Sequence, residues 1–184
     1  MGEIVVIQYV TLDGVVEDPD GRGGTEHGGW AFRFGPEAIA GDKFRLGPLL
    51  QSAELVFGRR TWEHFATLWP TRSDPFAGAM NAARKAVVTS SECDLGKWAN
   101  STVVADGVDG VARLATERDV VVIGSTSLVH ALAESGDVDE YRLIIFPTAL
   151  GTGRRLFARP ADLELVSAEA VGAGVLARYR PVPG

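Results

Sequence analysis

The chain has 184 residues, of which 46% are hydrophobic, and its formal net charge is −6 at pH 7. This length predicts a single domain, 1–184, that buries roughly 70% of its unfolded surface without help from metals or disulfides. The negative charge disfavours nucleic acids and anionic membranes as partners, because both bind basic surfaces. A single cysteine, Cys93, excludes an internal disulfide and fits a reducing cytoplasm.

Three further classes of protein are disfavoured by the sequence. No apolar run approaches the roughly 20 residues that a membrane-spanning helix needs. The N-terminus enters an apolar strand without the basic segment and cleavage site of a signal peptide. The histidines His27, His64 and His130 lie far apart without the spacing of metal ligands. We therefore expect a cytoplasmic protein with no membrane partner and no metal site.

Strands and helices alternate along most of the chain, and strands alone finish it. Predicted strands lie at 4–10, 54–58, 85–89, 102–104, 120–123, 139–146, 163–170 and 175–180, and predicted helices lie at 36–52, from 59 onward, at 108–116 and at 128–133. This order predicts a three-layer α/β fold, with a mainly parallel central sheet and antiparallel C-terminal strands. Two segments are predicted loops: 70–78, and a glycine- and acid-rich stretch at 15–29 that is long enough to be a functional loop or a mobile lid.

The rest of the chain is organised around the segment from Asp119 to Ala133. Four β-branched residues predict a strand that is buried on both faces. Gly124 then ends the strand, and a serine- and threonine-rich turn leads into a helix. Such a turn directs backbone N–H groups and the positive end of the helix dipole toward one point, which suits a phosphate. The same segment also fits an ordinary strand-to-helix turn, because the full Gly-x-Gly-x-x-Gly pattern is absent.

Two other predicted strand ends carry related chemistry. Gly58 is followed by Arg59, Arg60 and Thr61 at the start of a helix, and arginine can bind a phosphate through two hydrogen bonds. Three hydroxyl residues, 89–91, follow another strand. Because ligands bind beyond the carboxyl ends of parallel strands, these ends together predict an extended ligand with more than one phosphate, such as a dinucleotide.

These segments also carry a family resemblance. The stretch Val56–Glu63 resembles the Gly-Arg-x-Thr-Trp segment of dihydrofolate reductases, Val87–Ser91 resembles their next strand end, and Val122–Leu128 resembles their pyrophosphate turn. With Thr11–Gly14 and the block from Val138 to Phe157, the chain is identified as a member of the dihydrofolate-reductase-like family that includes the C-terminal reductase domain of riboflavin biosynthesis. The resemblance covers residues 4 to 180.

The resemblance implies a dihydrofolate-reductase-like fold and an NADPH cofactor. It implies contacts to the phosphates and adenosine of NADPH from the three strand ends, and contacts to the nicotinamide from the end of the first strand. The implied cofactor-binding residues are Val10, Thr11, Leu12, Gly58, Arg59, Arg60, Thr61, Thr89, Ser90, Ser91, Ile123, Gly124, Ser125, Thr126, Ser127 and Leu128. Dihydrofolate reductases have two glycines joined by a cis peptide where this chain has Gly124-Ser125, and the sequence leaves the isomer of this bond open.

On the substrate side, the resemblance implies one acid on the helix before the glycine-arginine turn. Asp42 has a matching spacing before Gly58 and would bind the substrate and help to protonate it. A surface aspartate beside Lys43 is the other interpretation. The aromatic residues Trp30, Phe32 and Phe44 are predicted either to bind a flat substrate ring or to lie in the core, and Arg33, Arg45 and Arg154 are candidates for binding a substrate phosphate.

The sequence therefore predicts an NADPH-dependent reductase that transfers a hydride to a small planar heterocycle, such as a pterin, a dihydrofolate-like compound or an aminopyrimidine. One alternative is a stand-alone reductase of the riboflavin pathway that acts on a ribosylated pyrimidine. Another alternative is a nucleotide-binding module without catalytic activity. The resemblance also implies a homodimer, for which the apolar stretch at 138–146 is a candidate subunit contact.

Overall fold

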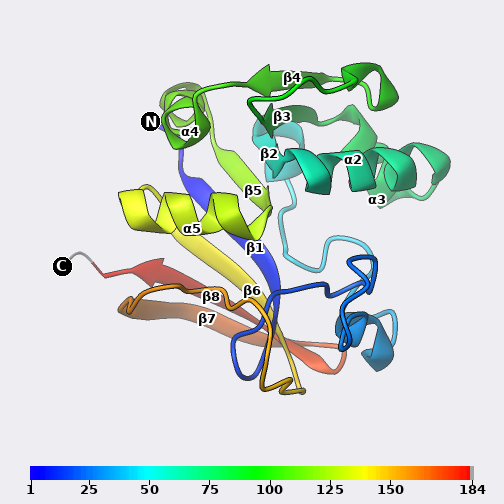
Figure 1. Ribbon diagram of the computed structural model, residues 1–184, viewed down its shortest axis with the longest axis vertical. Coiled ribbons are helices and arrows are strands. Elements are labelled where there is room, and N and C mark those ends of the chain that lie inside the picture. The colour runs from blue at the N-terminus through cyan, green and yellow to red at the C-terminus, as the bar shows by residue number, and fades with distance from the viewer. Residues whose placement is uncertain (183–184) are drawn as a thin grey trace. The chain divides into compact units, whose positions relative to one another are not determined.

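A computed structural model describes residues 1–182. Its strands form an eight-stranded sheet of order β4-β3-β2-β5-β1-β6-β8-β7 (Figure 1). The strands are β1 (Ile4–Thr11), β2 (Glu54–Gly58), β3 (Arg84–Val88), β4 (Ser101–Val104), β5 (Val120–Gly124), β6 (Glu140–Phe146), β7 (Leu163–Val171) and β8 (Gly174–Pro181). The helices are α1 (Leu49–Ser52), α2 (Arg59–Leu68), α3 (Pro75–Ala82), α4 (Gly107–Glu117) and α5 (Thr126–Ser135), with 3-10 turns η1 (Trp30–Phe34), η2 (Trp69–Thr71) and η3 (Leu95–Lys97). The predicted α/β fold, mainly parallel with antiparallel C-terminal strands, is confirmed.

The chain forms two compact units. The first unit contains residues 1–6 and 46–138, and the second contains residues 7–45 and the chain from residue 139 onward. The single domain predicted over 1–184 stays a prediction, and residues 183 and 184 of that range lie outside the described residues.

The first unit is built on parallel strands. Strand β5 pairs in parallel with the start of β1 on one side and with β2 on the other, and β2, β3 and β4 continue the parallel order. Every residue of β2 is buried, as are four of the five residues of β5. The unbroken apolar sequence of these strands follows from this position, because both faces of a parallel sheet are covered. Helices α2, α4 and α5 pack against this part of the sheet.

The second unit has an aromatic core. The ring of Phe146 lies 5.4 Å from that of Tyr9, 5.7 Å from that of Trp30 and 5.8 Å from that of Phe34, measured between ring centroids. Phe44 stacks on Tyr9 at 5.5 Å. Edge-to-face and offset ring pairs at these distances add attraction to the burial of apolar area. These aromatic side chains therefore hold the irregular segment that follows β1 against β6.

A buried ion cluster joins β6 to β8 in the same unit. The carboxylate of Glu140 accepts hydrogen bonds from Nε of Arg142 at 2.6 Å and from Nη2 of Arg178 at 2.8 Å. Burial raises the pKa of this carboxyl, but the hydrogen bonds from the two arginines outweigh it and hold the pKa of Glu140 below its usual value. Arg142 also donates to the carbonyls of Phe44 and Arg45, so the cluster fixes the end of the irregular segment.

Two predicted elements differ from the structure. The helix predicted at 36–52 is wrong, since α1 covers only its last turn; positive φ angles at Gly41, Arg45 and Gly47 interrupt the earlier part. The segment predicted as a loop at 70–78 contains the start of α3. Asp74 caps this helix by accepting hydrogen bonds from two backbone N–H groups, and a proline occupies its first position. This Asp-Pro pair is a helix-start signal that the sequence interpretation missed.

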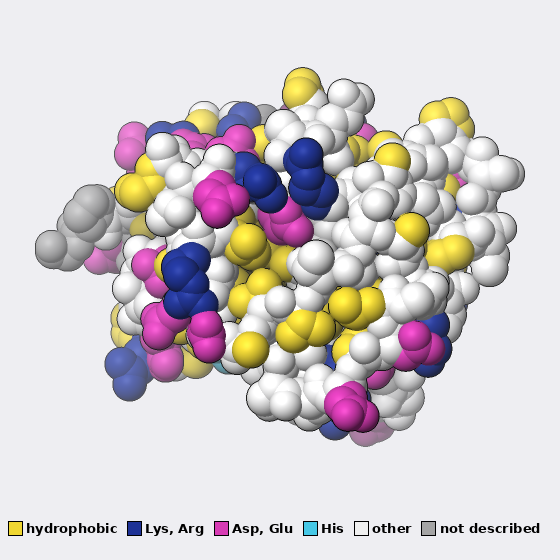
Figure 2. Space-filling model, turned by 90° about the horizontal axis from the view of Figure 1, so that it is seen from above, with side chains coloured by type: hydrophobic (Ala, Val, Ile, Leu, Met, Phe, Trp, Pro, Cys, Tyr) yellow, Lys and Arg dark blue, Asp and Glu magenta, His cyan; other side chains and the backbone are white. Residues whose placement is uncertain are grey.

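Three features of the structure concern possible partners: its helices, the charge pattern of one face and the burial of β6. Among residues 1–182, no helix is both long and apolar enough to cross a membrane. Figure 2 shows a face on which basic and acidic side chains lie next to one another around a band of hydrophobic side chains. The apolar stretch at 138–146 lies mostly in β6, which is almost wholly buried within the chain itself. It therefore offers little exposed surface to a second subunit, and the homodimer stays a prediction.

Lys85 is the most unusual charged residue of the first unit. Its side chain has no exposed surface, and Nζ donates to the carbonyls of Ala83 at 2.6 Å and Asn81 at 3.0 Å. The ammonium also lies 4.6 Å from the centre of the Trp98 ring. Burial lowers the pKa of Lys85 to about 8, although the carboxylate of Glu54 opposes this shift. The folded chain therefore releases this proton at a lower pH than the unfolded chain does.

We expect Lys85 to make the free energy of unfolding rise with pH above about 8, where the unfolded lysine still binds its proton. Relative to Lys85→Met, the wild type should gain at most about 1.4 kcal/mol per pH unit up to about pH 9.5. Urea unfolding across this range measures the difference. The exposed Lys97→Met is the control and should behave as the wild type does. A difference that is constant across the range would contradict the lowered pKa.

Candidate functional site

The carboxyl ends of four parallel strands form one edge of the first unit. In the sheet register, Phe57 of β2 lies opposite Gly124 of β5, and Gly58 lies opposite Val88 of β3. The β2–β5 register shifts just before Phe57, so Ile123 becomes an extra residue in β5. The three strand ends that the sequence singled out are therefore neighbours at this edge, as their parallel order requires.

Gly58 and Ser125 approach each other at this edge more closely than two ordinary residues can. A Cβ placed on Gly58 would lie 2.6 Å from Oγ of Ser125 and 3.1 Å from its backbone N. Only glycine fits such a position. The peptide bond between Gly124 and Ser125 is cis, which answers the question that the sequence left open. The turn after β5 is thus packed directly against the end of β2.

Two helices begin at these adjacent strand ends. Helix α5 is capped by Ser125, whose Oγ accepts a hydrogen bond from the N–H of Leu128 at 3.4 Å and lies 2.8 Å from Oγ of Ser127. Helix α2 begins after Gly58, which has no side chain to cap it. The first N–H groups of a helix have no acceptor within the helix, and the dipole makes this end positive. Two such ends side by side form a site for an extended anion.

Arg59 adds a positive side chain to the start of α2. Its guanidinium lies 3.4 Å from a carboxylate oxygen of Glu63, one helical turn away, and both side chains are about half-exposed. Exposed pairs of this kind contribute little to stability because water screens them. The guanidinium can therefore exchange this carboxylate for the phosphate of a ligand at small cost. Arg60 is exposed and Thr61 is half-buried on the same turn.

The loop after β3 lines a hollow of about 650 Å³ in the first unit, within the usual range of ligand pockets. Thr89, Ser90 and Ser91 line it together with Glu92, Cys93 and Asp94, and with Val103 and Ala105 at the end of β4. The hydroxyl of Thr89 accepts a hydrogen bond from the N–H of Ser91 at 3.0 Å, which fixes the turn. The two carboxylates were missed by the sequence interpretation, although they directly follow the hydroxyl run.

Two charged residues of α2 act on the thiol of Cys93, which lines this hollow. Burial raises the pKa of Cys93, the negative charge of Glu63 raises it further, and the positive charge of Arg59 lowers it. The thiol therefore lies within range of both charges of the Arg59–Glu63 pair. The residues predicted at the ends of β2, β3 and β5 all belong to the first unit, at the carboxyl ends of neighbouring strands.

The remaining predicted cofactor residues lie in the second unit. Val10 and Thr11 are buried at the end of β1, and Leu12 is 69% exposed. The hydroxyl of Thr11 donates to Asp13 at 2.5 Å, and the Asp13 carboxylate also accepts a hydrogen bond from the N–H of Gly151 at 2.7 Å. These hydrogen bonds lower the pKa of Asp13 to about 2. An ionised Asp13 therefore ties the end of β1 to the turn after β6.

The predicted substrate residues also lie in the second unit. Asp42 is half-buried in a turn, not on a helix as predicted, because the surrounding positive φ angles end helical structure there. Trp30 has no exposed surface and donates its indole N–H to the carbonyl of Glu17, while Phe44 is 7% exposed. Phe32 is 52% exposed and offers its ring to a ligand. Ligand contact by these residues stays a prediction.

Two of the three arginines named as phosphate candidates already donate hydrogen bonds within the second unit. Arg45 pairs with Glu169 at 3.1 Å, and Arg33 donates to the carbonyl of His27 at 3.2 Å. Arg154 lies on the exposed turn after β6. Across residues 1–182, no group of three histidine, cysteine, aspartate or glutamate side chains is arranged to hold a metal ion.

Sequence comparison gives the family. The profile of the RibD C-terminal domain matches residues 3–177. The chain belongs to the RibD C-terminal domain family. No curated protein matches this RibD C-terminal domain.

Several solved structures share its fold. A protein from Shewanella sp. PV-4, whose name assigns it provisionally to riboflavin biosynthesis, has a TM-score of 0.73 and 18% identity, with 98% of this chain and 99% of that chain covered. RibD from Acinetobacter baumannii has a TM-score of 0.66 and 16% identity, with 99% of this chain and 58% of that chain covered. Dihydrofolate reductase from Enterococcus faecalis, in complex with NADP(H), has a TM-score of 0.60 and 16% identity, with 99% of this chain and 98% of that chain covered. At these identities the three neighbours show that the fold is shared.

We expect Gly58→Ala to destabilise this RibD C-terminal domain, because its new methyl group would push against Ser125. Overpacking of this kind costs about 1–3 kcal/mol in the free energy of unfolding. Urea unfolding measures it. The matched control is Gly78→Ala in α3, where a Cβ has open space; it should be neutral or stabilising by up to about 1 kcal/mol. Equal stability of the two variants would mean that Gly58 and Ser125 are not in close contact.

Proposed function

We propose that this RibD C-terminal domain is an NADPH-dependent reductase that transfers a hydride to a small planar heterocycle, such as a pterin, a dihydrofolate-like compound or an aminopyrimidine. The observation that carries the proposal is the pair of helix starts at the adjacent ends of β2 and β5, packed together through Gly58 and Ser125. Two anion-binding helix ends suit a pyrophosphate better than a single phosphate. Membership of the RibD C-terminal domain family supports the same reading.

In this proposal, each strand end binds one part of NADPH. The backbone from Ile123 to Leu128 holds the pyrophosphate, with Gly58 and Thr61 beside it. Arg59, with Arg60 assisting, and the hydroxyl residues 89–91 bind the adenosine ribose and its 2′-phosphate in the hollow after β3. The phosphate displaces Glu63 from Arg59, and the charge-assisted hydrogen bonds then formed are stronger than the exposed ion pair.

The proposal assigns the reacting end to residues of the second unit. Val10, Thr11 and Leu12 flank the nicotinamide, and bound NADPH supplies the hydride. Asp42 holds the N–H groups of the heterocycle and relays a proton to it. Phe32 contacts the flat ring, and Trp30 and Phe44 support this region from the core.

A reductase of riboflavin biosynthesis is the more specific candidate, in which the heterocycle is a ribosylated aminopyrimidine. The names of the Shewanella and Acinetobacter neighbours favour it. A nucleotide-binding module without catalysis is the competing candidate from a different class.

Oxidation of NADPH distinguishes a reductase from a binding module. The absorbance of NADPH is followed in the presence of pterins, dihydrofolate or aminopyrimidines. A reductase consumes NADPH with at least one of these substrates, whereas a binding module quenches NADPH fluorescence without turnover.

We expect NADPH to bind at least tenfold more tightly than NADH, a difference of about 1.4 kcal/mol, because one charge-assisted hydrogen bond to the 2′-phosphate is sufficient for it. Isothermal titration calorimetry with both nucleotides measures the preference. Arg59→Met should abolish most of it. Equal affinities in the wild type would contradict the assignment of the 2′-phosphate to this hollow.

Glu63→Gln is the matched variant for this measurement. It removes the carboxylate that pairs with Arg59 while keeping the shape of the side chain. NADPH should then bind about two- to tenfold more tightly, and the affinity for NADH should stay unchanged, because only NADPH competes with Glu63 for the guanidinium. A parallel gain for both nucleotides would mean that the carboxylate acts on the pyrophosphate instead.

Asp42→Asn should lower turnover by about a hundredfold or more, within the range of general acid catalysis, and leave the affinity for NADPH unchanged. Stopped-flow or steady-state oxidation of NADPH measures turnover, and calorimetry measures affinity. Glu37→Gln, an exposed acid of the same segment, is the control and should be near neutral. Turnover of Asp42→Asn at the wild-type rate would exclude the acid role.

A further inference from the structure

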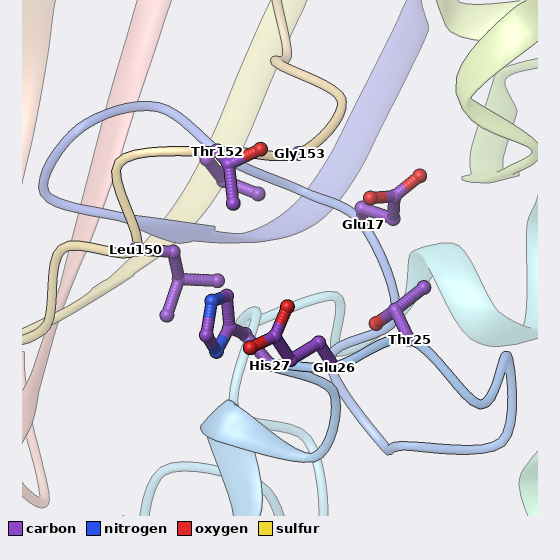
Figure 3. Close-up of a pocket in the computed structure, with 8 residues that line it drawn as sticks. Glu17, Thr25, Glu26, His27, Leu150, Thr152 and Gly153 are labelled. Carbon is purple, nitrogen blue, oxygen red and sulfur yellow. The ribbon is translucent and has the colours of Figure 1, made fainter.

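The second unit contains a cavity to which no role has been assigned. It has a volume of about 210 Å³ and is lined by three segments: 15–17 after β1, 25–27 in the glycine-rich loop, and 150–153 after β6. In Figure 3 the side chains of Glu26 and His27 project from the loop toward the turn that carries Leu150 and Thr152. Glu17 and Thr25 close another side of the cavity.

The walls of this cavity are held by hydrogen bonds. The carboxylate of Asp18 accepts from the N–H of Gly23 at 2.6 Å, and from the N–H and the hydroxyl of Thr25 at 3.0 and 2.9 Å. Burial raises the pKa of Asp18, but these bonds outweigh it and keep the pKa below its usual value. The loop is therefore an organised wall, and it does not have to be ordered when a ligand binds.

The other two segments are fixed to each other. The N–H of Val16 donates to the carbonyl of Arg154 at 2.9 Å, and the N–H of Gly151 donates to the carboxylate of Asp13. Gly153 has a φ of 112°, and a Cβ on it would lie 3.2 Å from a carboxylate oxygen of Glu17. A side chain at position 153 would therefore press on the carboxylate of Glu17.

The polar groups that line the cavity are mainly acceptors. The carboxylates of Glu17 and Glu26 accept hydrogen bonds, and the hydroxyl of Thr25 already donates its proton to Asp18. No lysine or arginine is among the described residues that line the cavity. The lining carboxylates therefore favour a cation over an anion, and within residues 1–182 no group of three ligating side chains is arranged for a metal ion. The side chains of His27 and Leu150 offer flat and apolar contact.

We propose that this cavity binds a small planar cation with several N–H donors, of the amidinium or guanidinium class. The two carboxylates accept its N–H groups through charge-assisted hydrogen bonds, the strongest kind available to them. The ring or stem of the ligand lies against His27 and Leu150. The volume admits a single ring, since it equals the space of about seven water molecules.

Benzamidine, a single flat ring with an amidinium group, is the probe, and benzamide is its uncharged counterpart. In ¹H–¹⁵N NMR titrations of the full chain, benzamidine should shift the amide signals of Thr25, His27 and Thr152, and benzamide should bind at least tenfold more weakly. The double variant Glu17→Gln/Glu26→Gln should lower the affinity for benzamidine at least tenfold. Glu164→Gln, an exposed acid of β7, is the control and should keep the wild-type affinity.

Three results would overturn the proposal: no shifts at these amides at about 10 mM benzamidine, equal affinity for benzamide, or unchanged affinity in the double variant. Should the double variant unfold, Glu26→Gln alone serves, because Glu26 is exposed. The affinity for NADPH, measured on the same samples, reports on the reductase proposal separately. It should be the same in the wild type and in the double variant.

Discussion

The contact between Gly58 and Ser125 is the constraint on which the proposed nucleotide site depends. Because Gly58 has no side chain, the turn after β5 can pack against the end of β2, and the starts of the two helices that follow these strand ends lie next to each other. With any larger residue at this position the two turns would have to separate. The anion-binding capacity of the edge thus comes from backbone N–H groups whose placement is fixed by one missing Cβ.

Charge at the same edge is balanced rather than simply positive. Arg59 is paired with Glu63, and Glu92 and Asp94 line the neighbouring hollow. This arrangement keeps the arginine side chain oriented before a ligand arrives, and it raises the energy of placing an anion there. A chain with a net charge of −6 can therefore bind a phosphate only where backbone dipoles and one guanidinium outweigh nearby carboxylates.

Carboxylates organise the second unit in a different way. Asp13 and Asp18 each accept several hydrogen bonds from N–H and hydroxyl groups, so that long irregular segments keep a defined shape without regular secondary structure. Glu140 likewise accepts hydrogen bonds from the side chains of two arginines. In this unit the acids serve mainly as structural acceptors. Glu17 and Glu26, which line a cavity, are the two carboxylates to which we instead assign a ligand.

The sequence by itself determined the strands, the fold class and the three glycine and hydroxyl turns, because buried parallel strands require unbroken β-branched runs and their ends require glycine. Tertiary structure decided the rest. The segment at 36–52 has apolar residues at helical spacing, yet its backbone follows the positive φ angles of Gly41, Arg45 and Gly47. Trp30 and Phe44 suit a ligand pocket as well as a core by composition, and contacts with Phe146 and Tyr9 place them in the core. Which side chains meet His27 in a cavity depends on the turn after β6, which is distant in sequence and which local pattern does not specify.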